Sequence, residues 1–167
     1  MILSAQSIRR FCTPNILDGK YPYAPEMDSP LISPFVERGV IRGKSYGLSA
    51  CTYDCRISHP LVIPVKQSRL AVTLEKFAFP NNICGSVLDK SSWARVFISA
   101  FNTHLDPGWK GFLTLELANL GEDYIEFQEG DPICQIKFEW LDFPTELPYQ
   151  GKYQHQGPKP TPAILEK

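Results

Sequence analysis

The stretch Thr114–Asn119 reads TLELAN, and its residues alternate as they do in a β-strand. Successive side chains of a strand point to opposite faces, so Leu115 and Leu117 share one face while Thr114 and Glu116 share the other. The pattern places the Glu116 carboxylate among small and apolar neighbours, where a charged group is uncommon unless it is paired or used. Glu116 is therefore either a residue of a solvated sheet face or a half-buried acid that takes and gives a proton.

A turn precedes this strand in the segment Leu105–Gly111, which reads LDPGWKG. The Pro-Gly pair is a turn signal, and Gly111 permits a close backbone approach as the next strand begins. The turn displays Asp106 and Trp109 together, which suits a sugar, because the carboxylate accepts a hydrogen bond from a hydroxyl while the ring packs on the furanose. The alternative is a β-hairpin whose Trp109 covers the edge of the core.

A second polar motif, Asp89–Arg95, reads DKSSWAR and follows an apolar run that predicts a strand. Ser91 or Ser92 is predicted to cap a short helical turn. The free N–H groups of a helix N-terminus, the two hydroxyls and Lys90 together predict a phosphate site, and Arg95 faces the same ligand from one turn further on. The alternative is an ordinary capped turn with a surface arginine.

These three motifs, in this order and at this spacing, resemble those of the dCTP deaminase branch of the dUTPase superfamily. Each motif is weak alone, but the resemblance extends over nearly the whole chain. It also includes the opening segment Met1–Arg10, the Tyr-Gly-Leu-Ser and Tyr-Asp-x-Arg elements of Ser45–Arg56, and the C-terminal Gly-Lys-Tyr-x-x-Gln-Gly segment of Gly151–Pro158.

The resemblance implies a mainly β fold, a distorted β-barrel or jelly roll of the dUTPase-like type with a short N-terminal helix, assembled as a homotrimer with sites between subunits. It divides the chain into a β domain, residues 1–148, and a C-terminal tail, residues 149–167, that closes over the nucleotide. The implied reaction is zinc-independent deamination of dCTP to dUTP and ammonia, with Mg²⁺ carried by the triphosphate. The alternatives are a bifunctional deaminase and diphosphatase that forms dUMP, a dUTP diphosphatase, and a non-enzymatic nucleotide-sensing protein.

The resemblance also assigns a role to each candidate residue. Glu116 is the proton shuttle, Arg95 pairs with it or stabilises charge at the attacked carbon, and Ser91 holds the reactive water or a phosphate. The loop Phe101–His104 reads the base, and His104 either contacts the ligand or is a surface residue. The substrate-binding set is Lys90, Ser92, Thr103, Asp106, Trp109, Tyr149, Lys152 and Gln156.

Composition and charge agree with a compact enzyme of one domain, since 167 residues bury a sizeable core. The net charge is −1 and the pI about 6.3, so no broad basic field for nucleic acid is expected. No apolar run approaches the roughly 18 residues of a membrane span, and no signal-peptide segment opens the chain. We therefore expect a cytoplasmic protein without membrane contact.

The cysteine pattern argues against a zinc site. Cys51 and Cys55 are evenly spaced and are expected to face one way, as half a metal site would require, but no second pair or His cluster completes it. Small buried thiols are the favoured reading of all five cysteines. Water activation is therefore expected to use protein groups alone, unlike in the zinc-dependent nucleotide deaminases.

Periodicity and turn signals predict a chain made mostly of short strands. A capped helix is expected over residues 4–11, residues 13–44 are expected to wrap the surface, and residues 143–167 form a Pro-rich tail that is mobile until it meets a ligand or subunit. The predicted strands are 70–77, 83–88, 96–101, 112–119, 124–127 and 133–140.

Overall fold

The computed structural model describes residues 1–13 and 29–165, and within them the chain is mainly β. Its strands form a four-stranded sheet in the order β1-β6-β10-β8, a six-stranded sheet in the order β2-β3-β4-β12-β7-β9, and the pair β11-β5. The elements are α1 (Ala5–Cys12), β1 (Ile32–Ser33), β2 (Gly39–Ile41), β3 (Lys44–Leu48), β4 (Thr52–Arg56), β5 (Leu61–Ile63), β6 (Ser68–Ala78), β7 (Ile83–Asp89), α2 (Ser91–Ala94), β8 (Ile98–Ala100), β9 (His104–Leu105), β10 (Lys110–Asn119), β11 (Ile125–Phe127) and β12 (Pro132–Trp140).

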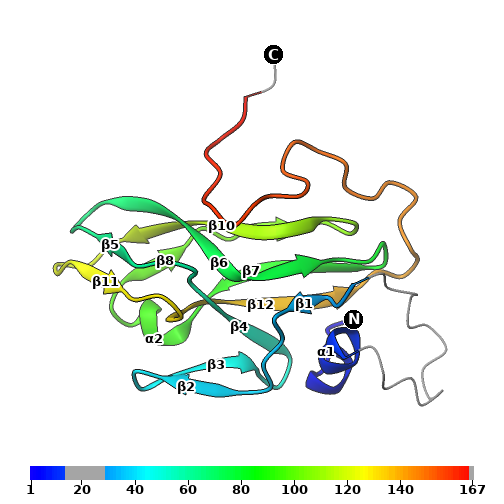
Figure 1. Ribbon diagram of the computed structural model, residues 1–167, viewed down its shortest axis with the longest axis horizontal. Coiled ribbons are helices and arrows are strands. Elements are labelled where there is room, and N and C mark those ends of the chain that lie inside the picture. Colours follow the sequence, from blue (N-terminus) through cyan, green and yellow to red (C-terminus); the bar gives the residue numbers. More distant parts are fainter. Residues whose placement is uncertain (14–28, 166–167) are drawn as a thin grey trace.

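The core lies between the two larger sheets. In Figure 1, β10 and β6 run along one side of the molecule, β12 and β4 lie beneath them, and α1 lies below β1 and β12. Leu115 and Leu117 of β10 and Phe138 of β12 are fully buried, and the rings of Phe79 and Phe138 stack with centroids 5.7 Å apart. The jelly-roll type of fold predicted from the sequence is therefore confirmed.

Most predicted elements are present, with corrections where the backbone turns. The predicted strand 96–101 is shorter in the structure, where β8 covers only Ile98–Ala100. Phe97 has φ +61, and the N–H groups of Val96 and Phe97 donate to carbonyls of α2, so these two residues belong to the turn that follows the helix. Lys90, not Ser91 or Ser92, is the N-cap of α2, and it makes no side-chain capping bond. Part of the 13–44 segment is regular, since β1 and β2 lie in it, whereas the expectation for residues 14–28 falls outside the described residues.

The register between β6 and β10 shifts in the middle of the pair. Phe112 is opposite Lys76, but Thr114 is opposite Val72, so three residues of β6 face one residue of β10. The Thr73 hydroxyl fills the gap, because it accepts a hydrogen bond from the Leu113 N–H at 3.0 Å and donates one to the Glu75 carbonyl at 2.7 Å. Two backbone groups that the ladder leaves unpaired are thereby satisfied.

A buried ion pair lies beside this irregularity. The Glu75 carboxylate is fully buried and accepts hydrogen bonds from the Arg56 backbone N–H at 2.9 Å and from Arg56 Nε at 2.7 Å. Burial raises the pKa of Glu75, while the bonds from Arg56 favour its ionised form. The pair ties β4 to β6 at the shift in register, and the Arg56 guanidinium also lies over the Tyr46 ring, 4.8 Å from its centroid.

We predict that Thr73→Val destabilises the fold, because it leaves the buried Leu113 N–H without a partner. The expected loss is about 1–3 kcal/mol in the free energy of unfolding, measured by chemical denaturation. Thr52→Val on β4 is the matched control, since no hydrogen bond of the Thr52 side chain is found within the described residues. Equal stability of the two variants would contradict the role given to the Thr73 hydroxyl.

Candidate functional site

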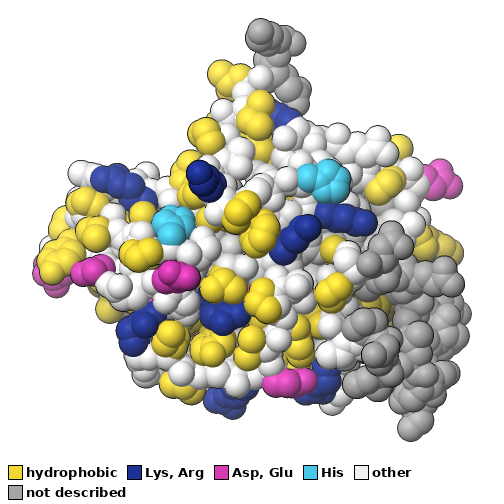
Figure 2. Space-filling view, in the orientation of Figure 1, with side chains coloured by type: hydrophobic (Ala, Val, Ile, Leu, Met, Phe, Trp, Pro, Cys, Tyr) yellow, Lys and Arg dark blue, Asp and Glu magenta, His cyan; other side chains and the backbone are white. Residues whose placement is uncertain are grey.

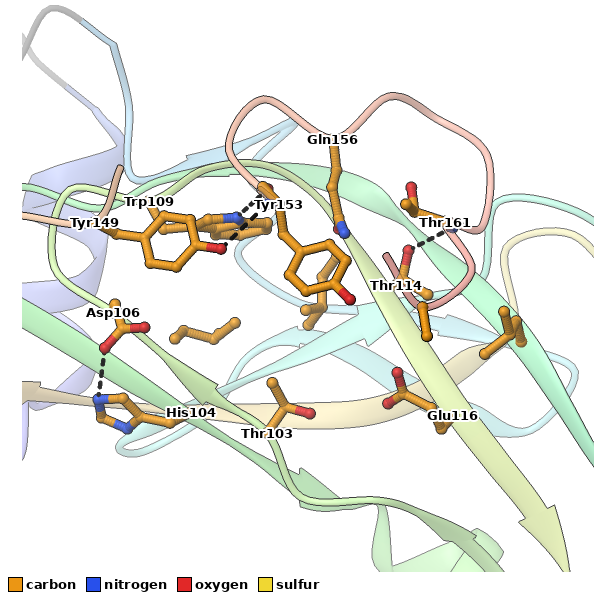
Figure 3. Close-up of a pocket in the computed structure, with 14 residues that line it drawn as sticks. Thr103, His104, Asp106, Trp109, Thr114, Glu116, Tyr149, Tyr153, Gln156 and Thr161 are labelled. Atoms are coloured by element: carbon orange, nitrogen blue, oxygen red, sulfur yellow. Dashed lines mark hydrogen bonds and ion pairs between the residues drawn. The ribbon is translucent and has the colours of Figure 1, made fainter. Parts of the chain in front are cut away.

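A cavity of about 370 Å³ opens between β10, the turn before it and the C-terminal tail (Figure 3). It brings together side chains that are up to 93 positions apart in the chain, since its lining runs from Leu70 to Ala163. The lining residues are Leu70, Thr103, His104, Leu105, Asp106, Trp109, Leu113, Thr114, Glu116, Tyr149, Tyr153, Gln156, Thr161 and Ala163.

One end of the cavity carries the acid and the aromatic ring predicted to hold a sugar, Asp106 and Trp109. Asp106 is exposed and lies 3.7 Å from His104, measured from carboxylate oxygen to Nε2. Trp109 is only 5% exposed, its Nε1 donates to the Tyr153 carbonyl at 2.8 Å, and its ring packs 6.4 Å from that of Phe79. Trp109 therefore combines the two readings of its motif, because it covers the core edge and also lines the cavity.

Glu116 lies at the opposite end of the cavity, on the same strand face as Thr114 (Figure 3). Its side chain is partly buried, and its cross-strand neighbour on β6 is the apolar Leu70. Within residues 1–13 and 29–165, the Glu116 carboxylate has no hydrogen-bond or ion-pair partner. A half-buried acid without a partner is available to exchange protons with a ligand, as the strand alternation predicts.

The tail runs along the start of β10 and closes one side of the cavity. Its backbone pairs with the strand, since the Phe112 N–H donates to the Gln156 carbonyl at 3.0 Å and the His155 N–H donates to the Lys110 carbonyl at 2.7 Å. Gly111 makes this approach possible, because a Cβ there would lie 2.8 Å from the Gln156 backbone nitrogen. Tyr149 and Gln156 reach the cavity from this tail.

Five of the predicted site residues do not line the cavity. Ser91, Ser92 and Arg95 are exposed on and after α2, where Arg95 Nη1 donates to the Ser91 carbonyl at 2.9 Å. Lys90 is buried, and its ammonium is 2.8 Å from an Asp54 carboxylate oxygen. Lys152 is exposed on the tail with its ammonium 5.5 Å from the centroid of the Tyr153 ring.

Several lining residues were missed by sequence reasoning. Tyr153 stands inside the tail motif but received no role, and Thr114 shares the strand face of Glu116. The sequence therefore held a signal for both residues, the tail motif for Tyr153 and the strand alternation for Thr114. Leu70 and Thr161 carried none, because their place depends on pairing between distant parts of the chain.

The expectation that all five cysteines are buried thiols is wrong for Cys51. Cys55 is fully buried, but Cys51 is exposed, because it precedes β4 and does not share its alternation. Burial raises the pKa of Cys12 to about 12, so its thiol is inert in the folded protein. No group of three His, Cys, Asp or Glu side chains among the described residues is arranged to hold a metal ion. No helix in the same ranges is long and apolar enough to cross a membrane.

Solved structures define the class of fold. The EIAV dUTPase is 24% identical with a TM-score of 0.51, over 60% of this chain and 84% of that chain. The dUTPase of Staphylococcus bacteriophage 80alpha with dUpNHpp is 14% identical with a TM-score of 0.51, over 60% of this chain and 75% of that chain. A dUTPase from phage phi11 of S. aureus, described with a structural Mg(II) ion, is equally similar, at 14% and 0.51. The chain has the dUTPase type of fold.

Within that class, sequence comparison identifies the family. A dCTP deaminase-like domain model matches residues 48–141. The dCTP deaminase of Thermococcus kodakarensis is 33% identical over 132 residues, covering 74% of this chain and 84% of that protein. The dCTP deaminase of Campylobacter concisus is 30% identical over 173 residues, covering 84% and 93%. The chain belongs to the dCTP deaminase-like family, which confirms the resemblance seen in its motifs.

We predict that Gly111→Ala detaches the tail from β10, because the new Cβ collides with the backbone of Gln156 rather than with a flexible side chain. Hydrogen exchange of the Phe112 amide, which donates to Gln156, is expected to accelerate at least tenfold. Gly157→Ala is the control, since a Cβ at that position meets nothing within 4 Å. Unchanged protection of Phe112 in Gly111→Ala would contradict this account of the tail.

Proposed function

We propose that this protein hydrolyses the 4-amino group of dCTP, giving dUTP and ammonia. The observation that carries the proposal is the partly buried Glu116, which has no partner among the described residues. It lies at one end of a cavity whose other end presents Asp106 and two aromatic rings. Family membership supports the same substrate. A diphosphatase acts at phosphorus and has no need of an acid at the end of the cavity remote from the sugar-binding turn.

The nucleoside lies along the cavity from Asp106 to Glu116. Asp106 accepts a hydrogen bond from the 3′-hydroxyl, and Trp109 and Tyr149 pack against the deoxyribose, which leaves no room for a 2′-hydroxyl. Thr103, at the end of the 101–104 loop, contacts the base edge. The pyrimidine then points its reacting carbon toward Glu116, and this orientation is the main contribution of binding to the rate.

Glu116 carries the proton transfers of the reaction. It takes a proton from water as the water oxygen attacks C4, and it delivers a proton to N3. It then helps the 4-amino group leave as ammonia, so the water oxygen becomes O4 of the uracil. Its position suits both steps, because the carboxylate lies at the end of the cavity where the reacting carbon of the base is placed.

The tail and a metal ion serve the triphosphate. Tyr149, Lys152 and Gln156 contact its oxygens when the tail is closed along β10. Mg²⁺ arrives with the nucleotide and is held mainly by phosphate oxygens and water, as this cation prefers. The ion belongs to the substrate, while the residues of the chain orient the phosphates.

The active unit is a homotrimer in which α2 completes the site of a neighbour. Three residues of α2 and its C-terminal end are exposed and lie outside the cavity of their own chain: Ser91, Ser92 and Arg95. They nevertheless match the family motif that holds the reactive water and stabilises charge in the reaction. An exposed apolar group adjoins them: Val96 (44%), Phe97 (66%), Phe101 (57%) and Leu120 (58%). A contact between subunits at this group buries these side chains and brings Arg95 to Glu116 of the next subunit. The ion pair between Lys90 and Asp54 fixes the N-terminal end of α2.

We predict that Glu116→Gln abolishes deamination and retains nucleotide binding, because it keeps the shape of the side chain and removes the proton shuttle. A loss of about 10²–10⁴-fold in kcat is expected, measured as ammonia released from dCTP. Glu122→Gln, in an exposed turn, is the matched control and is expected to keep the wild-type rate. A Glu116→Gln enzyme with most of its turnover would overturn the assignment.

We predict that two inactive variants restore each other when mixed. Glu116→Gln and Arg95→Ala subunits, unfolded and refolded together in equal amounts, form trimers in which about one quarter of the sites combine an intact Glu116 with an intact Arg95 of the neighbour. Activity is therefore expected to return to about one quarter of that of wild type. Recovery no greater than the sum of the separate variants would show that both residues act within one subunit.

A further inference from the structure

The chain continues past its tail motif, and the segment Thr161–Ile164, here called the strap, returns to the cavity. The Thr161 N–H donates to Thr114 Oγ1 at 3.0 Å, and the Ile164 N–H donates to the Tyr153 hydroxyl at 3.0 Å. Thr161 and Ala163 are themselves part of the cavity lining. The strap is thus fastened at two points, each of them a side chain that lines the cavity.

The fastening points place the strap at the Glu116 end. Thr114 and Glu116 are two residues apart on one strand face, so their Cα atoms lie about 7 Å apart along β10. In Figure 3, Thr161, Thr114 and Glu116 occupy the same end of the cavity, away from Tyr149 and Asp106. Toward its described end the chain projects from the body of the molecule (Figure 2), and Leu165 there is 85% exposed.

The strap is a wall of the cavity, not an occupant of it. With the strap in place, the cavity still measures about 370 Å³. Binding sites for small molecules start at roughly 300 Å³, so a nucleoside enters without displacing this segment.

The strap sequence favours a fixed conformation. Pro160 and Pro162 flank Thr161, and each fixes its own φ and lowers the entropy lost when the segment is ordered. Neither proline has an N–H, so the Thr161 N–H is the single backbone donor in residues 160–162, and it is the one bonded to Thr114. The Thr114 hydroxyl accepts this bond and keeps its own hydrogen to donate.

We propose that the strap is the wall against which the pyrimidine is held at Glu116, and that Thr114 and Tyr153 are positioning residues that fix the strap. This inference rests on the proposed function, since it takes the base to lie at the Glu116 end. The strap contacts the base, whereas Tyr149, Lys152 and Gln156 contact the triphosphate. The two parts of the C-terminal segment therefore have separable effects on binding.

The test uses a chain that ends at Lys159, which lacks the strap and retains the whole tail motif. Dissociation constants for dCTP are measured by calorimetry in the non-hydrolysing Glu116→Gln background, with inorganic tripolyphosphate as the probe for the triphosphate site. The truncated chain is expected to bind dCTP about tenfold more weakly and tripolyphosphate unchanged. A chain that ends at Leu165 is the control and is expected to match the full-length protein for both ligands.

Point variants show whether Thr114 and Tyr153 act through the strap. Thr114→Val and Tyr153→Phe are each expected to weaken dCTP about threefold to tenfold in the full-length chain, as loss of one hydrogen bond does. In the chain that ends at Lys159 they are expected to have no further effect, because the strap is already gone. Tyr124→Phe, on an exposed tyrosine, is the control and is expected to bind as wild type does.

Three results would overturn the inference about the strap: unchanged dCTP affinity after truncation, a parallel loss of tripolyphosphate affinity, or full additivity of the point variants with the truncation. Failure of the proposed function is recognised separately, because it appears as absence of ammonia release from dCTP by the full-length enzyme with Glu116 intact. An enzyme that deaminates dCTP normally and is indifferent to the strap would contradict the strap alone.

Discussion

The position of the Thr73 hydroxyl between β6 and β10 is the constraint on which the site depends. By bonding the Leu113 N–H and the Glu75 carbonyl, it stabilises the point where the register shifts. Beyond that point, Thr114 to Ala118 pair regularly with β6. Since a slip of one residue turns every side chain of a strand to the other face, this register decides that Leu115 enters the core and Glu116 enters the cavity.

The same shift in register joins the core to the tail. On one side of it, β10 pairs with β6 and β8, and on the other side Lys110 and Phe112 pair with the tail as well as with β6. The strand therefore carries the acid at one end and the docking surface for the tail at the other. A cavity built around one continuous strand holds its two ends at a fixed separation, which is the preorganisation that a proton transfer to a bound base requires.

Local patterns in the sequence were enough to predict β10, the turn before it and the short helical turn α2. Pairings between distant segments were not predictable. The break at Phe97, the strand β5 (Leu61–Ile63) and the pairing of Lys90 with Asp54 all depend on neighbours that no local period reveals. In the site, the strand alternation predicted the place of Glu116, and the turn motif predicted the role of Asp106. No sequence pattern predicted the position of the strap, because its partners, Thr114 and Tyr153, lie 47 and 11 positions away in the chain.

Isotope placement tests most directly the claim that water is delivered to the base and not to phosphorus. Incubation of dCTP with the enzyme and Mg²⁺ in H₂¹⁸O, followed by mass spectrometry of the separated nucleotides and their fragments, locates the incoming oxygen. We expect dUTP as the early product, with ¹⁸O at the exocyclic O4 of the uracil and no label in the phosphates. Label in the phosphates of a monophosphate product, with the base unlabelled or the cytosine intact, would contradict it.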